Sequence, residues 1–223
     1  MPTPHRTGLR PKDAASLLLV RNARSQPEFL MGRRAPRHTF MPDVFVFPGG
    51  AVNRSDGYAR PAGDLRGEVL EALTRDCTPH RARAIALAGI RETFEETGLM
   101  LARPADGRRT APRGWEAFAR AGLAPALDEL DYVAHAITPP GPPRRFHARF
   151  FLARADDLSG TLTSNGELLD LDWFGIEQAV DLPAPYITKL VLRAAMTVLR
   201  NGSGGAALPL ILHRRGKRVV SFT

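Results

Sequence analysis

The chain has 223 residues, a formal net charge of +8 and 43% hydrophobic residues, which is enough apolar material for a substantial core. A single cysteine excludes a disulfide scaffold and a cysteine-rich metal centre. No apolar run approaches the roughly 18 residues of a membrane-spanning helix, and the apolar run near the N-terminus is too short for a secretory signal. We therefore expect a cytoplasmic protein without a membrane partner.

The basic residues are nearly all arginine, because lysine occurs only at positions 12, 189 and 217. They are spread along the chain rather than clustered, so they indicate no specific nucleic-acid surface. Arginine offers a planar fork that suits phosphate groups, and an anionic small-molecule partner is equally compatible with this composition.

The N-terminal quarter of the chain predicts strands after a loose lead-in. Residues 1–12 are polar and contain prolines, and we expect a flexible segment there. Residues 14–20 and 28–34 read as strands that are separated by a polar turn, and 44–47 reads as a short strand. This strand leads into a Pro-Gly-Gly turn at 48–50, where glycines let the backbone approach another group closely.

Two helices are predicted in the middle of the chain. Residues 67–77 form a plausible short helix, and 81–97 form a longer one. The longer helix carries Leu87, Ile90 and Phe94 at i, i+3 and i+7, which is the spacing of an apolar stripe.

The end of the longer helix crowds three glutamates against Gly98, which predicts a helix stop. Glu95 and Glu96 fall in the last turn, where the helix dipole disfavours acids by roughly 0.3–1 kcal/mol each. Glu92 and Glu96 share one face, opposite the apolar stripe, and repel each other by about a few tenths of a kcal/mol. Arg91 offsets little of this repulsion. We therefore expect an exposed face of carboxylates that a bound cation would stabilise.

Further elements are expected in the C-terminal half. They are helices at 114–122, 175–182 and 185–202, strands at 132–137, 145–153 and 167–174, and a closing hairpin formed by 209–213 and 218–223. The order of strands, helix, strands and helix favours an α/β or α+β sandwich with a mixed sheet. The six histidines show no metal-ligand spacing, and His135 and His147 are predicted on different strands, so we expect structural or exposed roles for them.

The stretch RETFEETGL at 91–99 resembles the second half of the Nudix box, R-E-U-x-E-E-x-G-U, in which U is bulky and mostly apolar. Thr93 is an unusually polar residue at a U position. Gly50, five further residues and Asp56 resemble the first half, with Asp in place of Glu. Residues 57–90 separate the halves, where the plain box has seven residues, so the chain carries an insertion of 27 residues. Asp56 is either the equivalent motif acid or a turn residue.

The long insertion is itself similar to one branch of this family, the acyl-coenzyme A diphosphatases. That branch has FPGG, as at 47–50 here, followed by an insertion and then the glutamate helix. The stretch TPPGPPRRFHARFFLA at 138–153 also resembles this branch, with His147 where an Asp is expected. The resemblance covers roughly residues 14–185.

The resemblance implies a Nudix-type α/β/α sandwich with a mixed β-sheet. It implies one Nudix domain over 13–223, with the insertion at about 57–80 and a C-terminal helix plus hairpin at 185–223. Family members are often dimers, so a homodimer is an expectation, although no segment announces an interface.

Nudix hydrolases cleave a phosphoanhydride in a nucleoside diphosphate linked to another group, with a divalent metal and an attacking water. The resemblance implies that Glu92, Glu95 and Glu96 bind Mg²⁺ (or Mn²⁺), with a backbone carbonyl of Gly49 as a further ligand. Mg²⁺ takes one or two carboxylates, which suits acids at i and i+4 of one helix. Arg91 belongs to the same catalytic set, and Glu95 either holds a second ion or pairs with Arg91.

The general base in this family is either a glutamate of the box or an acid on a distant loop. Glu167 is our preferred candidate, and Asp170 is its alternative near Trp173. The residues expected to contact an anionic, diphosphate-containing substrate are Arg33, Arg34, Phe47, Gly50 and Arg145, with Arg144 beside them.

Three functions remain open from the sequence. The first is hydrolysis of coenzyme A or acyl-coenzyme A, and the second is the same chemistry on ADP-ribose, a dinucleotide or a nucleotide sugar. The third is a Nudix-fold module that binds a nucleotide ligand without hydrolysis. Such modules usually lose acids of the box, and this chain keeps all three glutamates of the helix, which favours an enzyme.

Overall fold

The computed structural model describes residues 10–37, 41–107, 110–156, 158–202, 209–214 and 217–222. The strands of its main sheet are β1 (Lys12–Arg21), β2 (Glu28–Arg34), β3 (Phe45–Val46), β4 (Gly49–Ala51), β8 (Asp131–Ile137), β9 (Phe146–Arg154), β11 (Leu168–Gly175), β12 (Pro209–Arg214) and β13 (Lys217–Phe222). They are ordered β11-β2-β1-β9-β8-β12-β13, while β3 pairs with β2 and β4 with β1. The β1–β9 and β8–β12 pairs are parallel and the others are antiparallel, so the sheet is mixed.

Helices and two small sheets complete the fold. The helices are α1 (Gly67–Thr74), α2 (Pro79–Thr97), α3 (Glu116–Arg120), α4 (Ile176–Asp181) and α5 (Tyr186–Asn201), with 3-10 turns η1 (Arg54–Tyr58) and η2 (Leu127–Glu129). The small sheets pair β5 (Leu99–Met100) with β10 (Ser159–Gly160) and β6 (Ala102–Pro104) with β7 (Leu123–Pro125). Within the described part of the chain, no helix has both the length and the apolarity needed to cross a bilayer.

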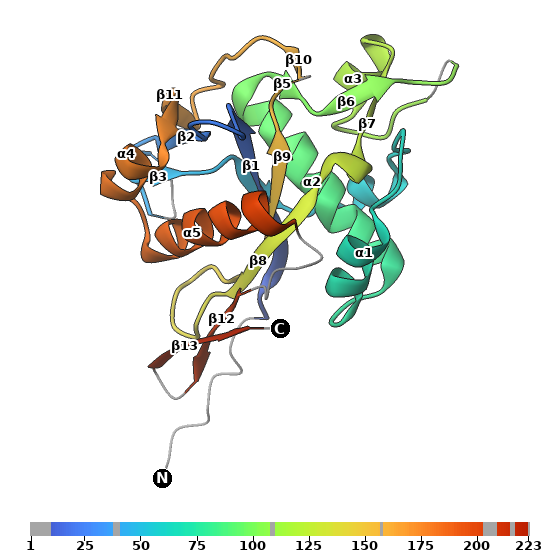
Figure 1. The fold of residues 1–223 in the computed structure, drawn as a ribbon. Coiled ribbons are helices and arrows are strands. Elements are labelled where there is room, and N and C mark those ends of the chain that lie inside the picture. Colours follow the sequence, from blue (N-terminus) through green and yellow to red (C-terminus); the bar gives the residue numbers. More distant parts are fainter. Residues whose placement is uncertain are drawn as a thin grey trace.

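The main sheet is covered on both faces. Four consecutive residues of β1, Leu17 to Val20, are each 0% exposed. Because successive side chains of a strand point to opposite faces, this burial requires packed layers on both sides. Figure 1 shows α2 and α5 on either side of the sheet, with α1 beside α2. The expected sandwich of helices around a mixed sheet is confirmed.

Helix α2 begins earlier than 81 because its start is capped. The Thr78 hydroxyl accepts a hydrogen bond from the Arg81 N–H at 3.3 Å, and Pro79 occupies the first helical position. Gly98 ends the helix in the left-handed conformation with φ of 73°, and its N–H donates to the Phe94 carbonyl. The stop signal at Gly98 was therefore a correct prediction.

The expectation of an exposed carboxylate face on α2 is wrong. Residues 84–91 are all buried, and Glu96 is only 7% exposed. Gly89 faces β1 and β9, and a Cβ there would make only ordinary contacts, at 3.4 Å from the Ala15 side chain and 3.8 Å from that of Phe151. Strand β4 and turn η1 cover another side of the helix. Glu96 therefore lies inside the molecule and the Glu92 side chain is only 17% exposed, whereas Glu95 stays exposed.

The lead-in is shorter than the predicted segment 1–12, because Lys12 already pairs with β9 as the first residue of β1. Residues 1–9 lie outside the described residues. The expected C-terminal hairpin forms from β12 and β13, which pair in antiparallel register. Its turn residues 215–216 lie outside the described part of the chain.

Candidate active site

The two glycines of strand β4 bring the backbone against the acids of α2. The Gly49 N–H donates a hydrogen bond to Glu96 Oε2 at 2.8 Å. A Cβ at Gly50 would lie 2.5 Å from the Glu92 carboxylate, and one at Gly49 would lie 2.4 Å from the Ala15 carbonyl oxygen. Since real Cβ atoms do not approach so closely, Gly49 requires glycine against the backbone of Ala15, and a side chain at Gly50 would displace the Glu92 carboxylate. The turn thus forms one wall of a site whose other wall is α2.

The two glutamates beside this turn have perturbed acidity. Burial raises the pKa of Glu96 to about 8; the Gly49 N–H opposes this, and the negative charges of Glu92 and Glu167 add to it. Burial also raises the pKa of Glu92, against the opposing effect of Arg91. Two buried carboxylates side by side are costly unless a positive charge offsets them.

Arg91 organises the acids around it. Its side chain is 2% exposed, its Nε donates to Asp56 Oδ1 at 2.8 Å, and its Nη2 donates to Asp56 Oδ2 at 3.1 Å. Nη1 lies 2.9 Å from Glu95 Oε2 and 2.8 Å from Glu92 Oε1, and Nη2 also donates to the Ala51 carbonyl at 3.1 Å. Burial lowers the pKa of Arg91, but the surrounding carboxylates outweigh it and the net direction is upward. Arg91 therefore fixes the positions of Glu92 and Glu95.

Asp56, whose role the sequence left open, is a buried partner rather than a solvated turn residue. It lies in η1 and is 0% exposed. Besides Arg91, it accepts hydrogen bonds from Trp115 Nε1 at 3.2 Å and from the Asn53 N–H at 2.8 Å. Its spacing from Gly50 was the available signal. Asp56 and Arg91 join the two halves of the interrupted motif.

A cavity of about 1040 Å³ opens beside these acids. Its lining includes Glu92, Glu96, Gly49, Gly50, Phe47, Arg34, Arg145 and Glu167. Its floor is formed by one face of the sheet, with residues of β1 and β9. This volume suits a ligand at the upper end of ordinary small-molecule sites.

The structure separates the predicted arginines Arg33 and Arg34. Arg34 lines the cavity, where burial lowers its pKa and the charge of Glu96 partly offsets that effect. Arg33 donates instead to Asp170 at 2.7 Å and to Asp43 at 2.9 Å, and it is not among the described residues that line the cavity. Adjacent residues of a strand point to opposite faces, which explains the difference. Glu95 is likewise held by Arg91 and does not contribute to the described lining.

The structure also separates the two candidate bases. Glu167 lines the cavity just before β11, with its carbonyl accepting from the Ala35 N–H at 2.9 Å and its own N–H donating to Asn165 at 2.8 Å. Its charge is close enough to raise the pKa of Glu96. Asp170 is tied to Arg33 and lies outside the described lining.

The arrangement of Glu92 and Glu96 fits a hard divalent cation. Carboxylate oxygens are the ligands that Mg²⁺ prefers, and it takes one or two carboxylates while keeping water and phosphate as further ligands. The absence of a side chain at Gly50 leaves room directly beside the Glu92 carboxylate. A cation here would also relieve the repulsion that raises the pKa of Glu96.

Comparisons with known proteins show what the whole chain resembles. No protein-family model matches the chain. A curated Caenorhabditis elegans protein named "Putative nudix hydrolase 7" is 24% identical in an alignment of 207 positions, which covers 80% of this chain and 59% of that protein. The chain thus spans less than two thirds of that relative. The crystal structure of a NUDIX hydrolase from Alicyclobacillus acidocaldarius is 27% identical with a TM-score of 0.64, covering 88% of this chain and 99% of that one.

In sequence and in fold, the chain is therefore similar to Nudix hydrolases.

Proposed function

We propose that this chain hydrolyses the diphosphate bond of a nucleoside diphosphate derivative, with a divalent metal ion held by Glu92 and Glu96. The observation that carries the proposal is the pair of partly and fully buried carboxylates on α2, against the side-chain-free turn at Gly49 and Gly50. They border a cavity large enough for such a substrate.

The residues of α2 have distinct proposed roles. Glu92 and Glu96 hold Mg²⁺ (or Mn²⁺), with the Gly49 carbonyl as a further ligand. When bound, the ion neutralises phosphate charge and makes a bound water more acidic. Arg91 is a positioning residue, because its guanidinium contacts Glu92 and Glu95 but lies buried behind them. The pairing of Glu95 with Arg91 supports an orienting role for Glu95 more than that of a ligand to a second ion.

Glu167 is the proposed general base. Its exposed carboxylate borders the cavity and is near Glu96, so it can accept a proton from the water that attacks phosphorus. The attacking water forms the new P–O bond, the bridging oxygen leaves with the other phosphate, and Glu167 holds the water's proton.

Coenzyme A or an acyl-coenzyme A is the proposed substrate class. Coenzyme A carries a diphosphate and a separate 3′-phosphate, and the cavity lining includes five cationic side chains: Arg10, Lys12, Arg34, Arg144 and Arg145. The lining also has an apolar part suited to a pantetheine or acyl chain: Ile137, Pro139, Pro142, Pro143, Tyr186 and Ile187. ADP-ribose, NADH or a nucleotide sugar carries only the diphosphate and would use fewer of these cationic groups.

A substrate panel with Mg²⁺ and with Mn²⁺ tests this proposal. The panel contains coenzyme A, acetyl-coenzyme A, a longer acyl-coenzyme A, ADP-ribose, NADH and diadenosine polyphosphates, with products resolved by mass. Dephospho-coenzyme A is the matched control, because it lacks only the 3′-phosphate. Release of 3′,5′-ADP and a phosphopantetheine is the expected result. Cleavage of the other compounds alone would retain the diphosphatase chemistry and discard the coenzyme A assignment.

A second experiment tests the metal ligands. We expect Glu96→Gln to lower Mg²⁺-dependent hydrolysis at least about 100-fold, because it removes a ligand charge. Circular dichroism checks that the fold is retained, and Asp170→Asn serves as a control outside the cavity lining. Full activity of Glu96→Gln would refute the assignment of the metal ligands.

A further inference from the structure

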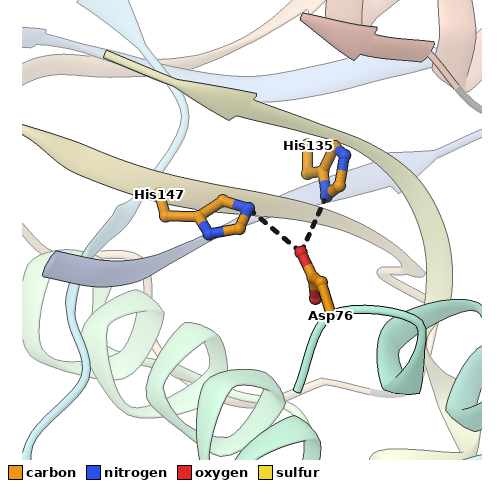
Figure 2. A group of neighbouring side chains, drawn as sticks. All are labelled: Asp76, His135 and His147. Atoms are coloured by element: carbon orange, nitrogen blue, oxygen red, sulfur yellow. Dashed lines mark ion pairs between the residues drawn. The ribbon is translucent and has the colours of Figure 1, made fainter. Parts of the chain in front are cut away.

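A second group of metal-ligating side chains lies away from the proposed active site. Asp76, in the connection between α1 and α2, faces His135 of β8 and His147 of β9 (Figure 2). Each residue offers one ligand atom, and these atoms all lie within 4.8 Å of one another. We call these three residues the His-Asp cluster.

The His-Asp cluster and the cavity use opposite faces of the same strands. Phe146 and Ala148, the neighbours of His147, line the cavity, whereas His147 is not among its described lining residues. Alternation along a strand accounts for this, because successive side chains point to opposite faces. The register pairs His147 with Ile137 and His135 with Arg149, so the two imidazoles are diagonal neighbours, with ring centroids 5.3 Å apart.

The distances from Asp76 to the two histidines are close to those of tetrahedral coordination. Asp76 Oδ2 lies 3.3 Å from His147 Nε2 and 3.7 Å from His135 Nδ1. Ligand bonds of about 2.0–2.1 Å at tetrahedral angles separate two ligand atoms by about 3.3–3.4 Å. Two imidazoles and one carboxylate form a set that Zn²⁺ commonly takes, with a fourth position left for water.

Buried nitrogen atoms in the cluster lack hydrogen bonds. Within the described part of the chain, both ring nitrogens of His135 and the Nε2 of His147 are buried without a hydrogen bond. Buried polar atoms are nearly always satisfied, and a bound ion would satisfy these. The Asp76 side chain is 33% exposed, which gives an ion and a water access from solvent.

We propose that Asp76, His135 and His147 bind a zinc ion, at a site separate from the glutamates of α2. This proposal does not rest on the proposed function. Such an ion would tie the connection between α1 and α2 to strands β8 and β9.

The surroundings of the cluster orient its ligands. Arg149 Nη2 lies 3.1 Å from Asp76 Oδ1, which leaves Oδ2 directed at the imidazoles. His147 Nδ1 lies 3.9 Å from Asp13 Oδ1, so a carboxylate faces the nitrogen of His147 that is turned away from Asp76. Such a carboxylate behind a ligating histidine is a common feature of zinc sites.

The local charges do not exclude a cation. Arg149 pairs with both Asp13 and Asp76, and Arg81 pairs with Asp13 at 2.8 Å, so two guanidinium groups face two carboxylates. Burial, together with the charge of Arg149, lowers the pKa of His147. Burial and the neighbouring His147 lower the pKa of His135 to about 4.

The test is a titration of the full chain after treatment with a chelator, in millimolar Mg²⁺ to occupy the glutamates of α2. Calorimetry with Zn²⁺ measures stoichiometry and affinity, and absorption with Co²⁺ reports coordination geometry. We expect one equivalent of Zn²⁺, intense visible Co²⁺ bands of a tetrahedral site, and a higher melting temperature with Zn²⁺.

Variants locate the ion. Asp76→Asn and His147→Ala should weaken Zn²⁺ binding by about 10- to 100-fold and abolish the Co²⁺ bands. His80→Ala, which removes an exposed histidine of α2, should leave both unchanged. The Glu92→Gln/Glu96→Gln double variant should retain the zinc site, which separates it from the proposed catalytic ions.

Two results would overturn the proposal. One is the absence of a tight equivalent of Zn²⁺ in the wild-type chain. The other is unchanged Zn²⁺ affinity and Co²⁺ absorption in Asp76→Asn, which would indicate adventitious binding elsewhere. Asp76→Asn carries the test even if a strand variant fails to fold, because Asp76 lies in an exposed connection and Asn preserves its shape.

Discussion

The buried pair of Asp56 and Arg91 makes a quantitative prediction about stability. In Asp56→Asn the carboxylate is removed while the Arg91 side chain stays 2% exposed. Removing one partner of a buried ion pair costs about 3–5 kcal/mol, because the other charge is left uncompensated. Glu92 and Glu95 still contact Arg91, so we expect the lower part of this range.

The expected loss in the free energy of unfolding is large enough to measure by urea denaturation or by thermal melting, each followed by circular dichroism. For a chain of this size, about 1 kcal/mol corresponds to about 2–4 °C in melting temperature, so a loss of about 3 kcal/mol lowers it by about 6–12 °C. The matched control is Asp170→Asn, which removes an exposed ion pair whose Asp is 59% exposed. Asn tolerates the positive φ of 50° at this position, and the expected loss is about 1 kcal/mol or less.

Equal destabilisation by Asp56→Asn and Asp170→Asn would refute this reasoning. It would mean that the contact of Arg91 with Asp56 adds no more to the free energy of unfolding than an exposed ion pair does. A change in the slope of the denaturation curve would instead indicate an altered denatured state, so the slopes are compared as well.

Three further predictions concern the site itself. Gly50→Ala should lower hydrolysis strongly, because the new Cβ would displace the Glu92 carboxylate. Gly67→Ala is the control, because there is open space around Gly67, and steady-state kinetics of both variants check the prediction. Glu167→Gln should lower kcat about 10²–10⁴-fold with little change in KM, whereas Asp170→Asn should not; the reverse result would make Asp170 the base. The pKa of Glu96 is raised from 4.5 to about 8 in the folded chain, so the metal-free protein loses stability as pH rises through this window. Glu96→Gln removes that contribution, and urea denaturation of both chains at pH 5 and pH 8 should show a smaller fall for the variant.

Long periodic elements could be predicted from the sequence. Strand β2 has the expected bounds, Glu28–Arg34, because an apolar run lies between polar turns. Helix α2 ends as expected at Gly98, but Thr78 and Pro79 also signalled its start and were missed as a cap. Strand β3 lies within the predicted strand at 44–47, whereas β4 and β5 have no detectable period and could not be predicted.

The site was only partly predictable because tertiary contacts decide burial and direction. The motif indicated that Glu92 and Glu96 act together, but not that Glu96 is buried. Which of Arg33 and Arg34 faces the cavity depends on which side of β2 that cavity occupies, and no pattern in the sequence sets this. His135 and His147 belong to different strands, so their proximity depends on the register of β8 and β9.

The contact between Asp56 and Arg91 also bears on how the chain tolerates its long insertion. The contact brings together the two ends of a 34-residue connection, residues 57–90, which is seven residues long in the plain motif. The entropy of closing a flexible loop grows with the logarithm of its length, so this extension costs only about 1.4 kcal/mol. Breaking the ion pair by removing one partner costs about 3 kcal/mol or more, which exceeds that cost. Length between the two halves is therefore thermodynamically cheap, and the connection ahead of α2 can vary in size while the two ends stay in contact.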